Sequence, residues 1–201
     1  QVSDAQSYHL QIAADRKFNN MIFDTTNISK TSVTIYNLDY FTEYFWRVSS
    51  ELNGKESIWS ETFSFTTVIA PPRLESPGNY NTAIPIKGIF KWDTVKGAEK
   101  YHIQVANKND YSEFVFEKIV ESNTTNYSNL EYNRDFHWRV KSKNKISESK
   151  WSPSNSFITV MSKPELFKPS NGAKHIPVEQ ELGWKYVDGA NKSDLRVPTN
   201  E

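Results

Sequence analysis

Short segments of the chain alternate between apolar and polar residues. In residues 101–106 the side chains of Tyr101, Ile103 and Val105 stand at every second position, and residues 136–141 alternate in the same way. This period of two is typical of a strand with one buried face, whereas no segment of a dozen residues shows the 3.6-residue period of a helix. We therefore expect β-strands at both places.

Further strands are predicted where Val, Ile, Thr and aromatic residues gather between turn-forming residues, at residues 89–92, 114–116, 126–127 and 156–160. About seven short strands within ~90 residues, separated by turns, are typical of an antiparallel β-sandwich.

The pattern repeats along the chain. Trp46 recurs as Trp138 and Trp59 recurs as Trp151, 92 positions later in both cases, and a third copy begins near Pro164. The sequence therefore predicts three parts. Residues 1–70 are a first module that lacks its N-terminal strands, residues 71–162 are a complete module, and residues 163–201 are the first strands of a third module.

Four short sequence motifs follow one another in the complete copy: Trp92, the Tyr-x-Ile-x-Val of residues 101–105, Trp138-Arg139-Val140, and Trp151-Ser152. In this order and spacing they resemble fibronectin type III repeats of the kind found in bacterial extracellular and cell-surface proteins. The resemblance covers essentially the whole chain. It implies an all-β fold of antiparallel, immunoglobulin-like β-sandwiches in tandem.

The corner between the E and F strands of this family has a leucine, followed six residues later by a tyrosine whose hydroxyl bonds back to the backbone. Leu38 and Tyr44 match this pattern in the first copy. In the second copy Leu130 is followed by Phe136, which has no hydroxyl. We therefore expect the corner hydrogen bond in the first copy only.

Arg47 and Arg139 alternate with inward-facing residues, so we expect them on the outer face of the sheet, beside Trp59 and Trp151. The Ser-x-Trp-Ser segments around these tryptophans resemble the second half of the Trp-Ser-x-Trp-Ser element of cytokine-receptor fibronectin modules. That resemblance implies a guanidinium stacked on an indole face. Because the pair occurs in both copies, we interpret it as part of the fold. The alternative is a surface that binds a sugar ring or a protein through exposed aromatic residues: Phe45, Trp59, Tyr111 and Trp151.

Composition narrows the classes of function. The 201 residues contain 24 basic and 24 acidic side chains, and this zero net charge argues against a nucleic-acid partner. The chain has no cysteine, which excludes disulfides, thiol nucleophiles and cysteine-bound zinc. The four histidines lack the spacing of metal ligands, and no nucleophile elbow or glycine-rich phosphate loop is present. We expect no catalytic residue, no metal and no cofactor. No apolar stretch approaches the ~20 residues of a membrane span.

The sequence favours a non-catalytic spacer, adhesion or interaction segment of a larger secreted or cell-surface protein. Two alternatives are a carbohydrate- or protein-binding module and an accessory region of a secreted polysaccharide-degrading enzyme or protease with its catalytic domain elsewhere. A protein or a glycan is the expected partner. The incomplete first and third modules suggest a further alternative, head-to-tail self-association, in which residues 164–189 of one chain fill the vacant edge of the first module of another.

Overall fold

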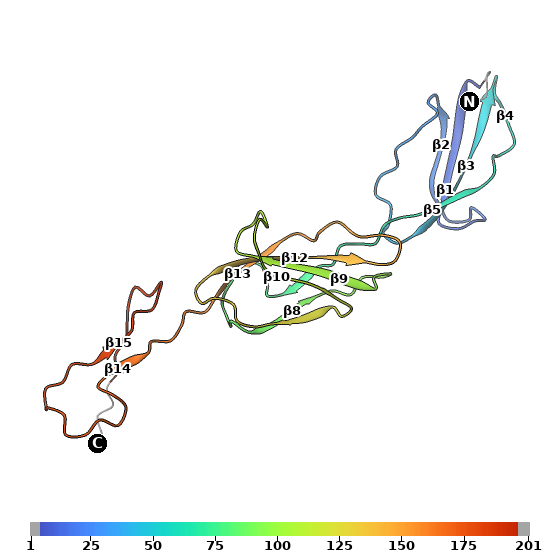
Figure 1. Cartoon of the computed structure of the whole chain (residues 1–201). Coiled ribbons are helices and arrows are strands. Elements are labelled where there is room, and N and C mark those ends of the chain that lie inside the picture. The colour runs from blue at the N-terminus through green and yellow to red at the C-terminus, as the bar shows by residue number, and fades with distance from the viewer. Residues whose placement is uncertain (1–4, 197–201) are drawn as a thin grey trace. The chain divides into compact units, whose positions relative to one another are not determined.

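The computed structural model describes residues 5–196, and every regular element in this range is a β-strand (Figure 1). This confirms the predicted all-β fold class. None of the described residues forms a helix that is long and apolar enough to cross a membrane. The chain divides into two compact units. The first runs up to Pro71 and includes Val95–Glu99 and Ser142–Lys150, and the second contains the rest. The module boundaries at residues 70 and 162 stay predictions.

The first unit contains one antiparallel sheet in the order β2–β1–β3–β4, with β5 also paired to β3. Its strands are β1 (Ser7–Ala13), β2 (Met21–Ile28), β3 (Glu43–Leu52), β4 (Lys55–Glu56) and β5 (Phe63–Thr66). Leu10 and Ile12 of β1 are buried on its inner face, where Ile35 and Leu38 of the following segment pack against them. Within the described part of this unit, no second sheet lies over that face.

The second unit contains a two-layered sandwich, here called the central sandwich. One layer has the order β10–β9–β12–β13–β7 and the other the order β11–β8–β6. The strands are β6 (Leu74–Ser76), β7 (Asn81–Ile84), β8 (Gly88–Trp92), β9 (Lys100–Ala106), β10 (Phe114–Val120), β11 (Thr124–Tyr127), β12 (Asp135–Lys143) and β13 (Asn155–Thr159). Among the strand pairs described for this unit's sandwich, β13 and β7 are parallel and the others are antiparallel.

The core of the central sandwich is aromatic. Phe90 of β8 lies between the layers, with its ring centroid 4.9 Å from that of Trp138, 4.6 Å from that of Tyr127 and 6.0 Å from that of Phe157. The Trp138 indole N–H donates to the Pro77 carbonyl at 3.1 Å, so this large ring is buried with its polar atom satisfied. The alternation seen in the sequence therefore places the large rings inside and the charged side chains outside.

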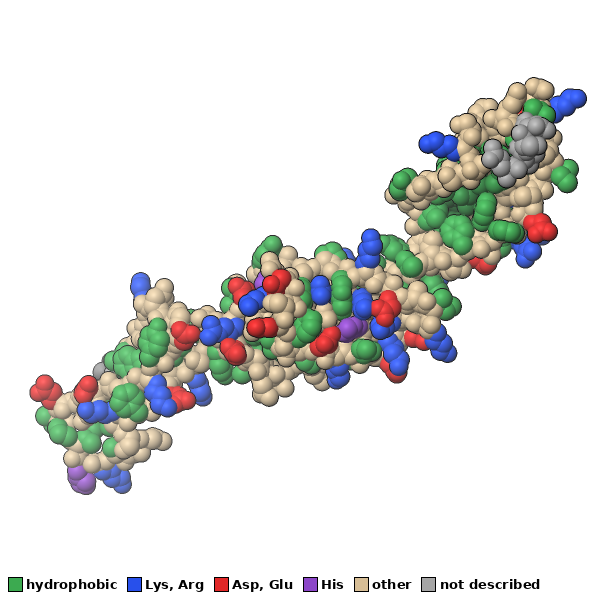
Figure 2. Space-filling model, turned by 45° about the horizontal axis from the view of Figure 1, so that its top comes forward, with side chains coloured by type: hydrophobic (Ala, Val, Ile, Leu, Met, Phe, Trp, Pro, Cys, Tyr) green, Lys and Arg blue, Asp and Glu red, His purple; other side chains and the backbone are tan. Residues whose placement is uncertain are grey.

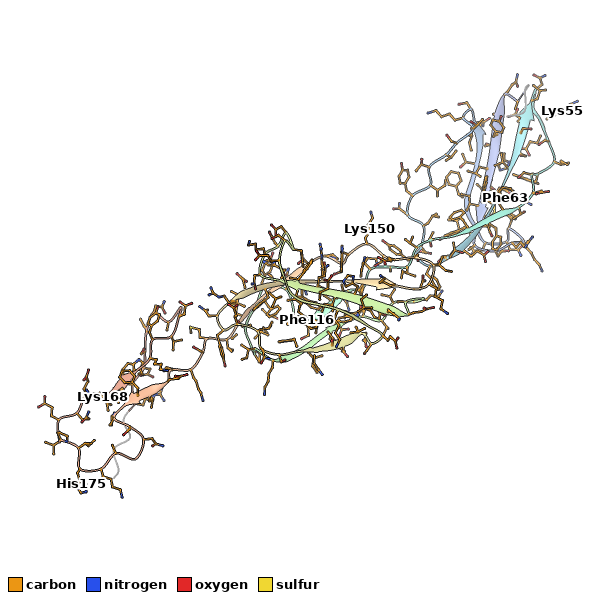
Figure 3. All side chains as sticks on the ribbon, in the orientation of Figure 1. Lys55, Phe63, Phe116, Lys150, Lys168 and His175 are labelled. Atoms are coloured by element: carbon orange, nitrogen blue, oxygen red, sulfur yellow. The ribbon has the colours of Figure 1, made fainter. Side chains whose placement is uncertain are left out.

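Two short strands follow the central sandwich, β14 (Leu166–Lys168) and β15 (Gly183–Trp184). They pair antiparallel, with Leu166 opposite Trp184 and Lys168 opposite Gly183. In Figure 3, Lys168 marks β14 and His175 marks the connection between the two strands. No third strand joins this ladder in the described residues.

Candidate functional site

Two equivalent groups of side chains lie on the outer faces of the large sheets. The Arg47 cluster consists of His9, Gln11, Phe18, Asp24, Arg47 and Trp59. The Arg139 cluster consists of His102, Gln104, Tyr111, Glu117, Arg139 and Trp151. Each member of one cluster stands 92 or 93 positions from its counterpart in the other.

Strand register aligns the polar members in a row. In the first unit Gln11 of β1 stands opposite Asp24 of β2 on one side and opposite Arg47 of β3 on the other. In the central sandwich Gln104 of β9 stands opposite Glu117 of β10. Side chains directly opposite in adjacent strands are close enough to interact. The pairing therefore brings a carboxylate, a glutamine and an arginine into contact across three strands.

Serine side chains position each tryptophan. In the first unit the Ser60 amide donates to the Val48 carbonyl at 2.9 Å, and the Val48 amide donates back to the Ser60 hydroxyl at 3.0 Å. Ser152 and Val140 repeat this exchange at 2.8 and 3.1 Å. The residue before each serine, Trp59 or Trp151, is thereby held against the sheet.

A tight turn supplies the second ring of each cluster. Phe18 and Tyr111 both have left-handed backbone conformations, with φ of 60° and 57°. The same backbone hydrogen bond closes both turns: the Phe18 N–H donates to the Asp15 carbonyl at 3.1 Å, and the Tyr111 N–H donates to the Lys108 carbonyl at 3.2 Å. A left-handed residue at this point turns the chain back toward the sheet and presents the ring to the arginine.

Each guanidinium lies between two rings. The Arg47 Cζ is 4.4 Å from the centroid of Trp59 and 4.0 Å from that of Phe18, and the Arg139 Cζ is 4.5 Å from Trp151 and 3.8 Å from Tyr111. These distances are within the range of cation–π attraction.

The edge of each guanidinium is hydrogen-bonded as well. Nε and Nη2 of Arg47 donate to Gln11 Oε1 at 2.9 and 2.7 Å, and the same atoms of Arg139 donate to Gln104 Oε1 at 3.0 and 2.8 Å. The charge is therefore paired with a neutral acceptor and two π faces, not with a carboxylate.

The carboxylate of each row pairs with the glutamine amide and a histidine. Gln104 Nε2 donates to Glu117 Oε1 at 2.7 Å, and His102 Nε2 lies 2.8 Å from the same oxygen. The Gln104 hydrogen bond first, and His102 second, hold the pKa of Glu117 below its ordinary value. In the first unit the His9 hydrogen bond is the main cause that lowers the pKa of Asp24.

The exposure expected for the candidate binding aromatics is wrong for Tyr111. Its side chain is only 7% exposed, because the ring packs against Arg139 and the hydroxyl is hydrogen-bonded to Ser154 at 2.5 Å. Burial raises the pKa of this hydroxyl. Trp59 and Trp151 are half-buried. Phe45 is also half-buried and lies on the same face of β3 as Arg47 but outside the cluster.

The residues of the two E–F corners differ in their contacts. The Asp39 amide donates to the Tyr44 hydroxyl at 3.0 Å, beside the half-buried Leu38. In the central sandwich Leu130 is buried, and Phe136 stacks on Phe157 with ring centroids 5.5 Å apart.

The sequence pattern indicated only the arginines, the tryptophans and Tyr111 among the cluster members. It did not indicate the other seven: His9, Gln11, Phe18, Asp24, His102, Gln104 and Glu117. His9 and His102 pack against the tryptophans, with ring centroids 4.8 and 5.1 Å apart. The repeat is the signal that relates these residues, since Phe18 aligns with Tyr111 and Asp24 with Glu117.

The clusters offer stacking and hydrogen bonding, and the described residues contain no group of three or more histidine or acidic side chains that could hold a metal ion. Their polar atoms bond mainly to one another. The arrangement therefore stabilises the outer face of each sheet and leaves each tryptophan half-buried.

Comparison with known proteins gives structural matches only. No family model and no curated protein matches the chain significantly. The solved structures that it resembles are fibronectin type III domains.

Three of these structures illustrate the likeness. A two-domain segment of chicken tenascin is 16% identical, with a TM-score of 0.40, over 79% of this chain and 87% of that structure. The FN1–FN3 domains of chicken CNTN1 are 16% identical, with a TM-score of 0.36, over 77% of this chain and 56% of that structure. The fn3 domain of the human collagen alpha-1(XX) chain is 22% identical, with a TM-score of 0.39, over 48% of this chain and 90% of that structure. The likeness is one of fold alone, and the description of the sandwich rests on the strand order of this chain.

Proposed function

We propose that this chain is a non-catalytic spacer and interaction segment of a larger secreted or cell-surface protein. The observation that carries the proposal is the recurrence of the outer-face cluster. The row of carboxylate, glutamine and arginine, with a ring on either side of the guanidinium, stands at equivalent positions in the first unit and in the central sandwich. A group that stabilises a module is needed in every copy, which favours a structural repeat over a single dedicated ligand site.

The internal bonding of the clusters supports the same function. Two guanidinium donors of Arg139 are used by Gln104, and rings cover both of its faces. A sugar or peptide that bound here would have to compete with these contacts. We therefore assign the clusters to module stability, and the function to the distance that stable modules set between other parts of the protein.

A distance measurement tests the spacer function. The chain has no cysteine, so Ile58→Cys and Ser128→Cys, both at exposed positions, accept spin labels specifically. Pulsed electron paramagnetic resonance should give one narrow distribution of the distance between the labels at residues 58 and 128. The reason is that Pro71 and Pro72 restrict the backbone between the first unit and the central sandwich. A broad distribution would contradict the proposal.

Linker variants provide a matched comparison. Pro71→Gly should broaden the distribution, since glycine restores the backbone freedom that proline removes. Pro164→Gly makes the same change outside the labelled span and should leave the distribution unchanged.

The competing binding function has its own outcome. Glycan arrays and protein capture with the intact chain would favour it if a ligand bound and was lost in Trp151→Phe while the melting temperature stayed the same. The spacer function predicts that the intact chain binds no ligand and that Trp151→Phe lowers the melting temperature, because the smaller ring covers less of Arg139.

A further inference from the structure

Two turns of the second copy of the repeat belong to the first unit of the structure. Val95–Glu99 and Ser142–Lys150 group with the residues up to Pro71, although both lie beyond these in the sequence. The two turns are joined to each other, since Asn144 Nδ2 donates to the Gly97 carbonyl at 3.1 Å. The first unit therefore contains parts of two consecutive copies of the repeat.

Within this unit, the ring of Phe41 packs directly against Gly97. A methyl group added at Gly97 would stand 2.5 Å from Phe41 Cζ, whereas carbon atoms in contact are usually about 3.5–4.0 Å apart. Phe41 is half-buried and lies in the E–F corner, between Leu38 and Tyr44. The glycine therefore leaves the space that the ring occupies, and a larger residue at position 97 would displace the ring.

The same two positions meet again 92 residues later, within the second unit. A methyl group added at Gly189 would stand 2.9 Å from Asn133 Cγ, and Asn133 Nδ2 donates to the Asp188 carbonyl at 3.5 Å. Asn133 is the counterpart of Phe41, and Gly189 is the counterpart of Gly97. The contact is apolar in the first unit and polar in the second, so its place in the repeat is kept while its chemistry changes.

The close approach is particular to these two glycines. Gly97 and Gly189 have left-handed backbones, with φ of 80° and 78°, and so do Gly54 and Gly172, both with φ of 75°. A methyl group added at Gly54 or Gly172 would have no atom within 4 Å. Backbone conformation therefore accounts for a glycine at all four positions, but only the two equivalent turns also use the glycine to admit a side chain from the preceding copy.

The E–F corner holds the side chain that makes the contact in a fixed place. Phe41 and Asn133 have φ of 46° and 49°. The amide that follows Phe41 donates to the Thr67 hydroxyl at 3.0 Å, and the amide that follows Asn133 donates to the Thr159 hydroxyl at 3.1 Å. Each threonine hydroxyl also donates to a corner carbonyl at 2.6 Å. The corner is thus tied to the strand that leads toward the next copy.

We infer that this contact, here called the corner joint, restricts the motion of consecutive copies of the repeat. The E–F corner of one copy is the docking surface, and the glycine turn of the following copy is its partner. A linker alone connects two copies at one point, whereas the corner joint adds a second contact outside the linker. The inference rests on the proposed spacer function and names the surface through which the chain performs it.

Electrostatic repulsion is a poor alternative source of stiffness. The chain has zero net charge, and Figure 2 shows basic and acidic side chains interspersed on the visible face of the second unit. Chains extend by self-repulsion when charges of one sign accumulate. A steric contact between consecutive copies therefore explains a restricted spacer better than charge does.

Gly97→Ala tests the corner joint in the full chain that carries spin labels at residues 58 and 128. The methyl group displaces the Phe41 ring, so the distance distribution should become broader than in the labelled wild type. Phe41→Ala removes the ring and should broaden the distribution as well. Because the two residues act through one contact, the double variant should be no broader than the broader single variant. Pro71 and Pro72 are unchanged in all three variants.

Gly54→Ala is the matched control. It adds the same methyl group to a left-handed glycine in the first unit, at the tip between β3 and β4, next to the labelled Lys55 in Figure 3. Alanine at positive φ is strained, so Gly54→Ala and Gly97→Ala should both lower the melting temperature. Only Gly97→Ala should broaden the distance distribution, since the methyl group at Gly54 meets no atom.

Nuclear magnetic resonance reports the contact independently of the spacer function. The ring current of Phe41 should shift the Gly97 Hα resonances in the wild type, and the shift should be lost in Phe41→Leu. Unshifted Gly97 resonances in the wild type would overturn the inference, as would narrow distributions for both Gly97→Ala and Phe41→Ala or equal broadening by Gly54→Ala. A narrow wild-type distribution that these variants leave narrow rejects the corner joint and keeps the spacer function, whereas a broad wild-type distribution rejects both.

Discussion

At the scale of single residues, the chain repeats interactions more faithfully than it repeats side chains. Phe18 is replaced by Tyr111 and Asp24 by Glu117, yet the ring still covers the arginine and the carboxylate still accepts from the glutamine. A cation–π contact at a partly exposed site is worth about 0.5–2 kcal/mol. Each cluster therefore contributes a modest, local stabilisation to its own sheet.

The carboxylate of the Arg139 cluster makes the stability of the central sandwich depend on pH. The pKa of Glu117 is lowered in the folded chain from its ordinary 4.5, so the stabilisation is present above about pH 4.5 and is lost as the pH falls through the lowered value. Glu117→Gln removes this titration. Urea denaturation at pH 7 and pH 3 should show a larger loss of unfolding free energy for the wild type than for the variant. Equal losses would contradict the assignment.

The corner hydrogen bond differs between the copies by one oxygen atom. Tyr44→Phe removes the acceptor of the Asp39 amide and should lower the stability of the first unit by about 0.5–1.5 kcal/mol. Phe136→Tyr supplies the missing oxygen in the central sandwich and should be neutral or stabilising. Melting curves of both variants check the pair, and a clear fall in melting temperature for Phe136→Tyr would count against the alignment of the two corners.

At the scale of elements, β8 makes the difference between a finished and an unfinished core. Its inward residues Phe90 and Trp92 are fully buried, and Phe90 contacts rings from both layers. In the described residues of the first unit, no strand occupies the equivalent place. This five-residue strand, at the centre of the layer β11–β8–β6, therefore contributes two of the large side chains that seal the core.

Truncation of this strand's central ring should be costly. Phe90→Ala is expected to lower the unfolding free energy of the central sandwich by about 3–5 kcal/mol, because a large aromatic side chain is lost from a closed core. Ile89→Ala on the same strand points outward and should cost about 0.5 kcal/mol or less. Urea titrations of the two variants provide the comparison, and similar effects would show that β8 does not seal the core.

At the scale of the whole molecule, the two units have cores of different completeness. Phe65 of the first unit is more exposed than its counterpart Phe157 of the central sandwich, and the hydrophobic stabilisation is roughly proportional to the apolar area removed from water. The first unit should therefore be the less stable of the two in dilute solution.

Hydrogen exchange can measure this difference directly. In dilute solution the amides of Leu10 and Val48 should exchange faster than those of Ile103 and Val140, their counterparts in the central sandwich. Equal protection of the two sets at low concentration would contradict the inferred order of stability.

Much of this protein is determined by local pattern. The alternation in residues 101–106 and 136–141 correctly predicts β9 and β12, and the repeat correctly relates Trp46 to Trp138 and Trp59 to Trp151. Side-chain direction in a strand follows from the period of the backbone, so such features can be read without a structure.

Contacts between strands required the tertiary structure. The burial of Tyr111, the row from Glu117 through Gln104 to Arg139, and the matching ladders of Leu74–Trp92 and Leu166–Trp184 depend on register and on turns that join distant residues. Alternation alone does not determine which strands are neighbours or which face is covered. Sequence by itself therefore determined the elements and the repeat, and only the tertiary structure decided which apolar faces are closed, because burial depends on what packs against a strand.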